Sequence, residues 1–292
     1  MKAATAGWVF AAPALGVIAL FFGVPVLAAL VLSLTDFDIY ALADLHNLRF
    51  VGLHNYVALL LNPLFWQALG NTFYFVVVGV PLSIATSLAA ALLLHSKLGW
   101  FKPFFRTAYF APVVTTVVAV AVVWRYLFHT RYGLVNWALS HMGVHPIDWL
   151  GDPHWAMPTI IVFAVWKNFG YNMIIFLAGL QAIPENLYEA ARIDGASAWR
   201  QFLHVTLPML GPVLLMVGIL TLAGYFQLFA EPYVMTQGGP LQSTVSVLYL
   251  MYEEGFKWWN LGNASAVAFL LFVLMTTITS AMLWFARRKG AE

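Results

Sequence analysis

The residues best suited to a specific interaction lie in a polar stretch between two long apolar segments, at positions 183–208. Pro184 and Glu185 suit the start of a helix, where proline fits the backbone and a carboxylate stabilises the positive end of the helix dipole. Gly195 suits the left-handed position that follows a helix. We therefore expect a helix of roughly ten residues here, followed by a second helix that Ser197 caps.

One face of the expected first helix is suited to close contact with another protein. Leu187, Ala190 and Ala191 fall at i, i+3 and i+4, and the two alanines would let a partner approach closely. Glu189 and Arg192 can pair at i, i+3 on the helix surface. On these residues alone, an ordinary solvated loop helix is as good an interpretation as a docking helix.

A second group of polar side chains gathers histidines and acids in another loop. Its members are His141, His145, Asp148, Asp152 and His154. Metal ligation would need these side chains to converge, but Gly143 and Pro146 argue against a helix through the histidine pair. We expect a surface loop and no metal site.

Several kinds of chemistry are excluded by residues that the chain lacks. It has no cysteine, which excludes disulfides, thiolate metal sites, iron–sulfur clusters and cysteine nucleophiles. It has no Gly-Lys dipeptide, so the phosphate-binding loop of many ATPases is absent. If the chain works with ATP, another chain must hydrolyse it, and we expect no catalytic residue and no cofactor here.

The composition of the chain is that of an integral membrane protein. Of its 292 residues, 62% are hydrophobic and only 9% are charged, whereas a soluble domain has about 25% charged residues. A soluble chain this apolar could not cover its surface with polar groups. The composition therefore excludes a soluble enzyme or nucleic-acid binder.

Helices that cross a bilayer core of roughly 30 Å need about 20 apolar residues. Six stretches qualify, at 9–34, 72–94, 107–124, 156–182, 209–230 and 261–286. We expect an all-α membrane protein in which residues 1–292 form a single transmembrane domain. The first apolar run is too long for the 7–15 residues of a signal peptide, so we interpret it as the first span. Residues 56–69 resemble a short helix in the membrane interface.

Basic residues indicate the orientation of these spans. With both termini in the cytoplasm, nine of the fourteen lysines and arginines lie inside and four lie outside. The nine are Lys2, Lys97, Lys102, Arg106, Arg192, Arg200, Arg287, Arg288 and Lys289. The positive-inside rule favours this orientation, which places the loop 183–208 in the cytoplasm, between spans four and five.

The spacing within that loop resembles a known signature. Glu189-Ala190-Ala191 is followed after three residues by Gly195 and, after nine more, by Val205, one residue and Leu207-Pro208. This pattern is similar to the "EAA" signature in the membrane subunits of bacterial ABC importers, although isoleucine is usual where Val205 stands. Asp194 before Gly195 looks like the carbohydrate branch of that family, the maltose and glycerol-phosphate permease type.

Further motifs along the chain are similar to segments of the same branch. They are Val51-Gly-Leu-His-Asn-Tyr56, Asn71-Thr72, Leu180-Gln-Ala-Ile-Pro184, Thr236-Gln-Gly-Gly-Pro240 and Gly262-Asn-Ala-Ser-Ala266. The resemblance covers roughly residues 8–288. Their order along the chain, and the side of the membrane expected for each, match the family.

The resemblance implies a subunit of a binding-protein-dependent sugar importer in the bacterial inner membrane. It implies that the short helix couples to a cytoplasmic ATPase through Glu189, Ala190, Ala191, Asp194 and Gly195. It also implies a second related permease subunit, two ATPase subunits that bind ATP and Mg²⁺, and an extracytoplasmic solute-binding protein. A homodimer stays open, as do the identity of the sugar and the choice between a sugar and glycerol phosphate.

Polar and aromatic residues within spans four and five are candidates for contact with a transported molecule. They are Asn168, Gly170, Tyr171, Thr221, Gly224, Tyr225 and Leu228. In span five Thr221, Tyr225 and Leu228 share one helix face, and the family places a sugar contact in these parts of the two helices. Packing between helices is the alternative, because small and hydroxyl residues are enriched there as well.

Lys167 is the one charge well inside an expected span. A lysine at the bilayer centre costs about 2.5–3.5 kcal/mol on insertion scales, so it should face a cavity, a partner or a carboxylate. Glu231 is the nearest candidate carboxylate within the same chain, but it is expected about half a span further outward. Two interpretations stay open, contact with substrate and snorkelling toward an outer vestibule.

Three other functions compete with an importer subunit. An ion-coupled secondary transporter usually needs carboxylates within the membrane, but all twelve acids lie outside the central parts of the six spans. A lipid-modifying membrane enzyme would need clustered acids or histidines, and only the weak loop group is present. A protein that serves only as a structural anchor would not account for the signature in the loop 183–208.

Overall fold

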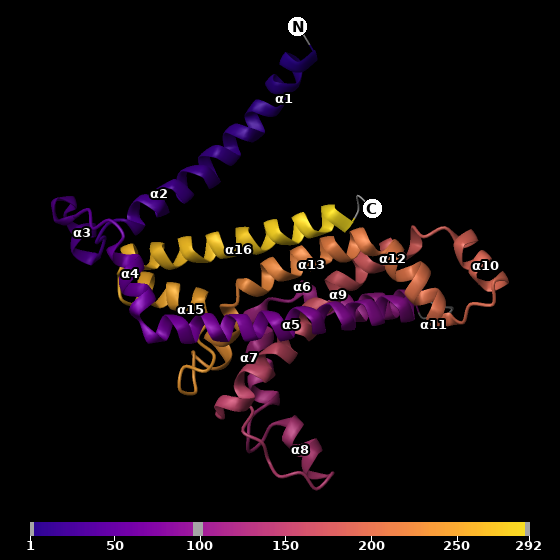
Figure 1. Cartoon of the computed structure of the whole chain (residues 1–292). Helices are drawn as coiled ribbons and strands as arrows, with labels where there is room; N and C mark the ends of the chain where they lie inside the picture. The colour runs from indigo at the N-terminus through magenta and orange to yellow at the C-terminus, as the bar shows by residue number, and fades with distance from the viewer. Residues whose placement is uncertain (1–2, 96–101, 290–292) are drawn as a thin grey trace. The chain divides into compact units, whose positions relative to one another are not determined.

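The computed structural model describes residues 3–95 and 102–289, so Lys2 and Lys97 lie outside the described residues. The described chain is helical, and its only strand-like feature is an isolated bridge between Thr35 and Phe50. It divides into two compact units, Met1–Trp66 with Val247–Leu274 and Gln67–Ser246 with Met275–Glu292. Figure 1 gives the order of the helices along the chain.

The first unit contains the start of the chain and the region before its last helix. Its helices are α1 (Ala3–Ile18), the π-turn η1 (Ala19–Gly23), α2 (Val24–Ser33), α3 (Ile39–Ala43), the 3₁₀ turn η2 (Leu45–Asn47), α4 (His54–Leu61), α15 (Val247–Tyr252), the π-turn η5 (Glu253–Lys257) and the first part of α16 (Leu261–Lys289). α1, η1 and α2 follow one another directly and form one apolar stretch, Gly7–Ser33.

Two of the sequence motifs meet at the end of α2. The buried Asn55 amide donates to the carbonyls of Ser33 and Thr35, at 2.9 and 2.7 Å. The backbone N–H of Gly262 donates to the Phe37 carbonyl at 2.9 Å, and a Cβ on Gly262 would lie 2.3 Å from the Thr35 oxygen. Asn55 and Gly262, from two of the sequence motifs, therefore stabilise the turn that follows α2.

The second unit holds the remaining helices. They are most of α5 (Pro63–His95), α6 (Lys102–Val114), α7 (Val117–Leu127), α8 (Leu134–Ser140), α9 (Pro153–Gln181), α10 (Glu185–Ile193), α11 (Ala198–Gln201), the π-turn η4 (Phe202–Thr206), α12 (Leu207–Met209), α13 (Gly211–Phe226) and α14 (Ala230–Met235). α9 packs against α6, α7, α13 and α14. Its side chains Met173, Phe176 and Leu180 are buried in an apolar cluster with Ala91 of α5 and Val217 of α13.

Among the described residues, four helical stretches are long and apolar enough to span a membrane: Gly7–Ser33, Pro63–His95, Pro153–Gln181 and Leu261–Ala286. Two bent pairs raise the number to six if each pair is one span. Lys102–Val114 and Val117–Leu127 meet at 100°, and Ala198–Met209 and Gly211–Phe226 meet at 68°. The stretch 107–124, expected as the third span, is not one continuous helix, because α6 ends at Val114 and α7 begins at Val117 in another direction.

The expected interface helix over residues 56–69 is also wrong in its extent. α4 ends at Leu61, and α5 begins at Pro63 and continues into the long span. Asn62 separates the two helices, and its side-chain oxygen accepts from the Leu64 N–H at 2.9 Å. This bond satisfies an N–H that the first turn of a helix leaves free, so Asn62-Pro63 starts a new helix rather than interrupting one.

Candidate functional site: the α10 loop and the interior helices

The loop between α9 and α13 forms the short helix that its sequence predicts. α10 covers Glu185–Ile193, and Gly195 has a φ of +75°. The Ala196 N–H donates to the Ala191 carbonyl at 2.9 Å and the Gly195 N–H to the Arg192 carbonyl at 3.1 Å. These two bonds form the Schellman motif that ends a helix with a left-handed glycine. The predicted helix and its glycine stop are confirmed.

α10 presents its motif residues to the outside. None of its residues is buried, and Glu189, Ala190, Asp194 and Gly195 are exposed. Ile193 is 87% exposed at the end of the helix. A short helix with an uncovered apolar residue and accessible alanines has the surface that a protein groove can accept.

The helix is fixed to the rest of its loop by a tyrosine. The Tyr188 hydroxyl lies 2.9 Å from the hydroxyl of Thr206, which is buried in η4. Arg192 donates to the Tyr188 carbonyl at 3.2 Å rather than pairing with Glu189. The predicted cap of the second helix is confirmed, because the Ser197 hydroxyl accepts from the Arg200 N–H at 3.4 Å. The loop therefore has internal ties and an exposed outer helix.

The candidates in α9 and α13 divide into packed and exposed residues. The buried Thr221 hydroxyl accepts a 2.8 Å hydrogen bond from the Asn172 amide and so joins the two helices. Tyr225 is 4% exposed, and its ring stacks on Phe75 with ring centroids 4.9 Å apart. A Cβ on Gly79 of α5 would lie 2.5 Å from the Tyr225 ring. Gly79 therefore leaves the space that this ring occupies.

The remaining candidates show the same division. Gly170 is packed so closely on α6 that a Cβ would lie 2.1 Å from the Tyr109 carbonyl oxygen. Leu228 is buried, and the Asn168 amide donates to the Ala164 carbonyl of its own helix at 3.0 Å. Tyr171 is 49% exposed, and the space around Gly224 is open. Tyr171 and Gly224 are thus the two candidates that an outside molecule can reach most directly in this chain.

Lys167 neither snorkels outward nor faces an open space. Its residue is 7% exposed, and its Nζ donates to the Val113 carbonyl at 3.2 Å. Val113 lies in the last turn of α6, where backbone carbonyls have no partner within the helix. The snorkelling expectation is therefore wrong, and the ammonium satisfies the end of a broken span.

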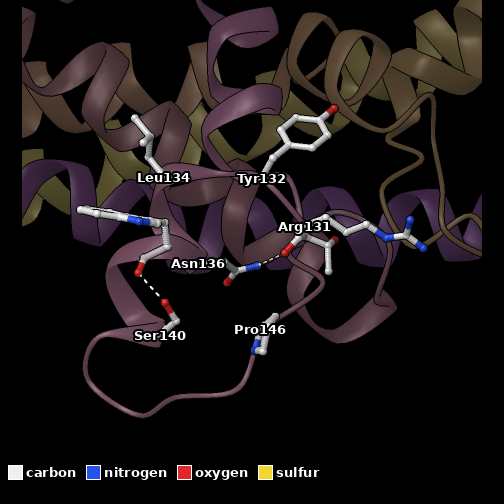
Figure 2. Close-up of a pocket in the computed structure, with 8 residues that line it drawn as sticks. Arg131, Tyr132, Leu134, Asn136, Ser140 and Pro146 are labelled. Atoms are coloured by element: carbon white, nitrogen blue, oxygen red, sulfur yellow. Dashed lines mark hydrogen bonds between the residues drawn. The ribbon is translucent and has the colours of Figure 1, made fainter.

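The sequence analysis missed one buried polar residue in the loop between α7 and α9. Asn136 is 5% exposed, and its amide nitrogen donates to the carbonyls of Thr130 and Ile147 at 3.0 and 2.8 Å. Its oxygen accepts from the Ile147 N–H and the Trp149 indole N–H at 3.2 and 2.8 Å. Figure 2 shows Asn136 among the residues lining a pocket of about 320 Å³. The feature of the sequence that could have pointed to Asn136 is a polar residue between apolar ones in a short helix.

The histidines and acids of that loop do not converge. The His141 ring lies 2.8 Å from the Trp137 carbonyl, whereas the His154 ring lies 3.0 Å from Asp152. Within residues 3–95 and 102–289, no three His, Asp or Glu side chains form a group that could hold a metal ion.

Comparison with known proteins decides the family. The model for "Binding-protein-dependent transport system inner membrane component" matches residues 83–290, which is more than half of the chain. The chain belongs to this family. The permease is 39% identical to the lactose transport system permease of Rhizobium radiobacter, with 97% of this chain and 94% of that protein covered. It is 36% identical to the trehalose/maltose transport system permease of Thermococcus litoralis, with 98% and 95% covered.

Solved structures give the same fold. The permease matches a bacterial ABC transporter that imports the acidic polysaccharide alginate, with a TM-score of 0.80, 22% identity, and 97% and 96% of the two chains covered. A second structure, of a bacterial alginate transporter with an alginate pentasaccharide-bound periplasmic protein, has a TM-score of 0.80 at 21% identity and covers 96% and 93%. The family match and the sugar permeases that resemble this chain make the permease an inner-membrane transport subunit rather than an enzyme, and ATP hydrolysis belongs to a partner subunit.

Among the carboxyl groups outside the apolar segments of the permease, Asp152 and Glu254 have pKa values shifted in opposite directions. The backbone N–H of His154, followed by its ring, lowers the pKa of Asp152 at the start of α9. Burial raises the pKa of Glu254 in η5, although a hydrogen bond from the Asn263 side chain opposes this change. The surroundings of Asp152, which caps α9, thus stabilise its charged form, whereas burial destabilises the charged form of Glu254.

Proposed function

We propose that the permease forms one half of the membrane pathway of an ATP-driven, binding-protein-dependent carbohydrate importer. The substrates named for its relatives support a sugar, since they are lactose in one case and trehalose or maltose in another. A third relative, 34% identical with 80% of this chain covered, is an arabinooligosaccharide transport system permease of Bacillus subtilis. Carbohydrate is the substrate class common to all three.

The proposed topology has six spans with both termini in the cytoplasm. The four long helices are spans one, two, four and six, and the two bent pairs are spans three and five. α10 then lies in the cytoplasm between spans four and five. The excess of basic residues expected on that side supports this orientation.

α10 is proposed as the coupling helix, with Glu189, Ala190, Ala191, Asp194 and Gly195 in contact with the ATPase. The observation that carries this proposal is the exposure of a well-ended helix directly between α9 and α13. A rigid helix between two spans can transmit closure of the ATPase as a movement of those spans. Its tie through Tyr188 to Thr206 supports movement as one body.

The remaining parts of the importer are supplied by other chains. We propose a second related permease subunit, two cytoplasmic ATPase subunits that hold ATP and Mg²⁺, and an extracytoplasmic solute-binding protein. The periplasmic protein bound to the alginate transporter supports the last of these by analogy.

For the substrate path we propose unequal roles for the residues of α9 and α13. Tyr171 and Gly224 line the path, because one is exposed and the other borders open space. Gly170, Thr221, Tyr225 and Leu228 support the path by packing or bonding within the chain, and the Asn168 amide is bonded within α9 itself.

The decisive experiment measures ATPase activity of the co-expressed complex in liposomes, with and without the binding protein and a panel of sugars. Gly195→Asp strains a left-handed turn at the end of α10 and should abolish stimulation. Gly143→Asp is the matched control, because Gly143 has a φ of +77° and a Cβ there would also meet open space, but it lies in the outer loop. If no ATPase subunit co-purifies with the intact chain, the proposal fails.

A further inference from the structure

Three helices of the second unit form a small basic pocket beside the start of the α10 loop. The pocket has a volume of about 220 Å³ and lies between the end of α5, the start of α6 and the end of α9. Its lining residues are Leu94, His95, Lys102, Arg106, Leu177 and Gln181. No acidic residue is among them, so the pocket carries a positive charge.

Lys102 and Arg106 supply this charge from one face of α6, because they are four residues apart. Like charges at this spacing repel each other. In the described part of the chain the ion pairs lie elsewhere, at His46, His154 and Lys257, so neither cation has a carboxylate partner there. Neither side chain donates a hydrogen bond to another described residue. An anion bound between them would offset the repulsion and accept hydrogen bonds from both.

The polar lining as a whole suits a phosphate group. The planar Arg106 guanidinium can donate to two phosphate oxygens at once, and the Lys102 ammonium acts as a compact charge. The Gln181 amide and the His95 ring add donors from the other two helices. Arg106, Gln181 and His95 are exposed and Lys102 is half-buried, so an anion can enter. The pocket volume is several times the roughly 30 Å³ that a water molecule occupies in the liquid, which leaves room for a polyatomic anion.

The buried part of the lining is apolar. Leu94 and Leu177 are 4% and 5% exposed and belong to the apolar cluster of α5, α9 and α13. Phe104, in the first turn of α6, is 67% exposed. Apolar surface next to a basic rim suits an amphiphile with a phosphate head group, and basic pockets between membrane helices on the cytoplasmic side bind such head groups.

We propose that this pocket binds a phosphate group, carried by an anionic phospholipid or present as the free anion. Lys102 and Arg106 provide the charge, and His95 and Gln181 provide further donors. Gln181 is the last residue of α9, and α10 begins at Glu185. A bound phosphate therefore joins the ends of three helices directly before the α10 loop. The site does not depend on the transported substrate, and only its position in the cytoplasmic leaflet rests on the proposed topology.

The test measures hydrogen exchange of residues 104–108 and 177–182 in the full complex during titration with three probes. The probes are dioctanoyl phosphatidylglycerol, inorganic phosphate, and dioctanoylglycerol, which has the acyl chains but no phosphate. Binding at the pocket should slow exchange in both segments, because they contribute its lining on α6 and α9.

Two double variants and a matched control identify the groups that bind. Lys102→Gln with Arg106→Gln removes the charges, whereas Lys102→Arg with Arg106→Lys keeps them. Arg200→Gln with Arg288→Gln is the control, because it removes two charges from exposed residues that are expected on the same side of the membrane but do not line the pocket. Melting temperatures without any probe show which variants are folded.

Phosphatidylglycerol, inorganic phosphate or both should protect the parent. Protection by the lipid alone assigns a lipid head group, protection by phosphate alone assigns a free anion, and protection by both assigns the phosphate group whatever carries it. Removal of the two charges should raise the half-maximal concentration at least about tenfold, because hydrogen bonds between charged groups are among the strongest in proteins. The charge-keeping variant and the control should bind like the parent.

Three results would overturn the site. One is a parent that neither phosphate probe protects, which requires no variant to fold. Another is equal protection by dioctanoylglycerol, which would show that acyl chains bind without a phosphate. The third is equal weakening in the control, which would show a general attraction of anions to this side of the protein. The measurement needs neither sugar nor ATP hydrolysis, so a complex without sugar-dependent stimulation would contradict the proposed function and leave this test intact.

Discussion

The Asn172 amide donates a 2.8 Å hydrogen bond to the Thr221 hydroxyl, which connects the middle of α9 to the middle of α13. Both side chains are buried, at 4% and 6% exposure. These helices enter and leave the loop that contains α10, so the bond joins the two arms on which the proposed coupling depends. Thr221, which the sequence suggests for substrate contact, therefore links two helices in the structure.

Thr221→Val should destabilise the permease by about 1 kcal/mol, because it leaves a buried Asn172 N–H without an acceptor within the apolar interior. Thr221→Ser keeps the hydroxyl and should behave like the parent. Thermal unfolding of the purified complex, followed by tryptophan fluorescence, measures the difference. A rise in the KM for transported sugar with unchanged stability would show instead that the hydroxyl contacts substrate.

Gly170→Ala should destabilise the packing of α9 on α6 by about 1–3 kcal/mol, the range for overpacking a core. The added Cβ would lie 2.1 Å from a backbone oxygen of Tyr109, which has no flexible end that could move aside. Gly224→Ala is the control, since nothing lies within 4 Å of the added atom. Comparison of their melting temperatures tests the close approach, and equal values would contradict it.

Asn136→Asp should loosen the loop around α8, between α7 and α9. The substitution keeps the shape of the side chain but places an oxygen where an amide now donates to the Thr130 and Ile147 carbonyls. Loss of two donors to buried carbonyls should cost about 1–3 kcal/mol. Hydrogen exchange of residues 128–152 should quicken, whereas Ser140→Ala, which removes a more exposed hydroxyl, should leave it unchanged. If hydrogen exchange in this loop is equally slow in both variants, Asn136 does not stabilise the loop.

Glu254 should make the stability of its unit depend on pH. Burial raises the pKa of this carboxyl above its ordinary value of 4.5, so the folded protein binds the proton more tightly than the unfolded chain. Its contribution is fully present below the unfolded pKa and is lost as the pH rises through the folded pKa. Melting temperature measured from pH 4 to pH 8 should show this fall, and Glu254→Gln should flatten it. An unchanged slope in Glu254→Gln would assign the pH dependence to other groups.

Local features of the chain were predictable because each depends on a few neighbouring residues. The helix from Glu185, the left-handed Gly195 and the Ser197 cap follow from short-range backbone preferences, and the structure has all three. The membrane class follows from composition, since so few charged residues could not cover a soluble surface. The family resemblance depends on spacing in the sequence, and the family comparison confirms it.

Contacts between distant segments were decided only by tertiary structure. The break after Val114 leaves little trace in hydropathy, because both halves are apolar and only the packing of α6 and α7 shows the bend. The same holds for Lys167 on the Val113 carbonyl, the hydrogen bonds of Asn136 and the bond from Asn172 to Thr221. A buried polar group needs a hydrogen-bond partner, and its residue type indicates that need. Only the packing of the helices determines which group becomes the partner.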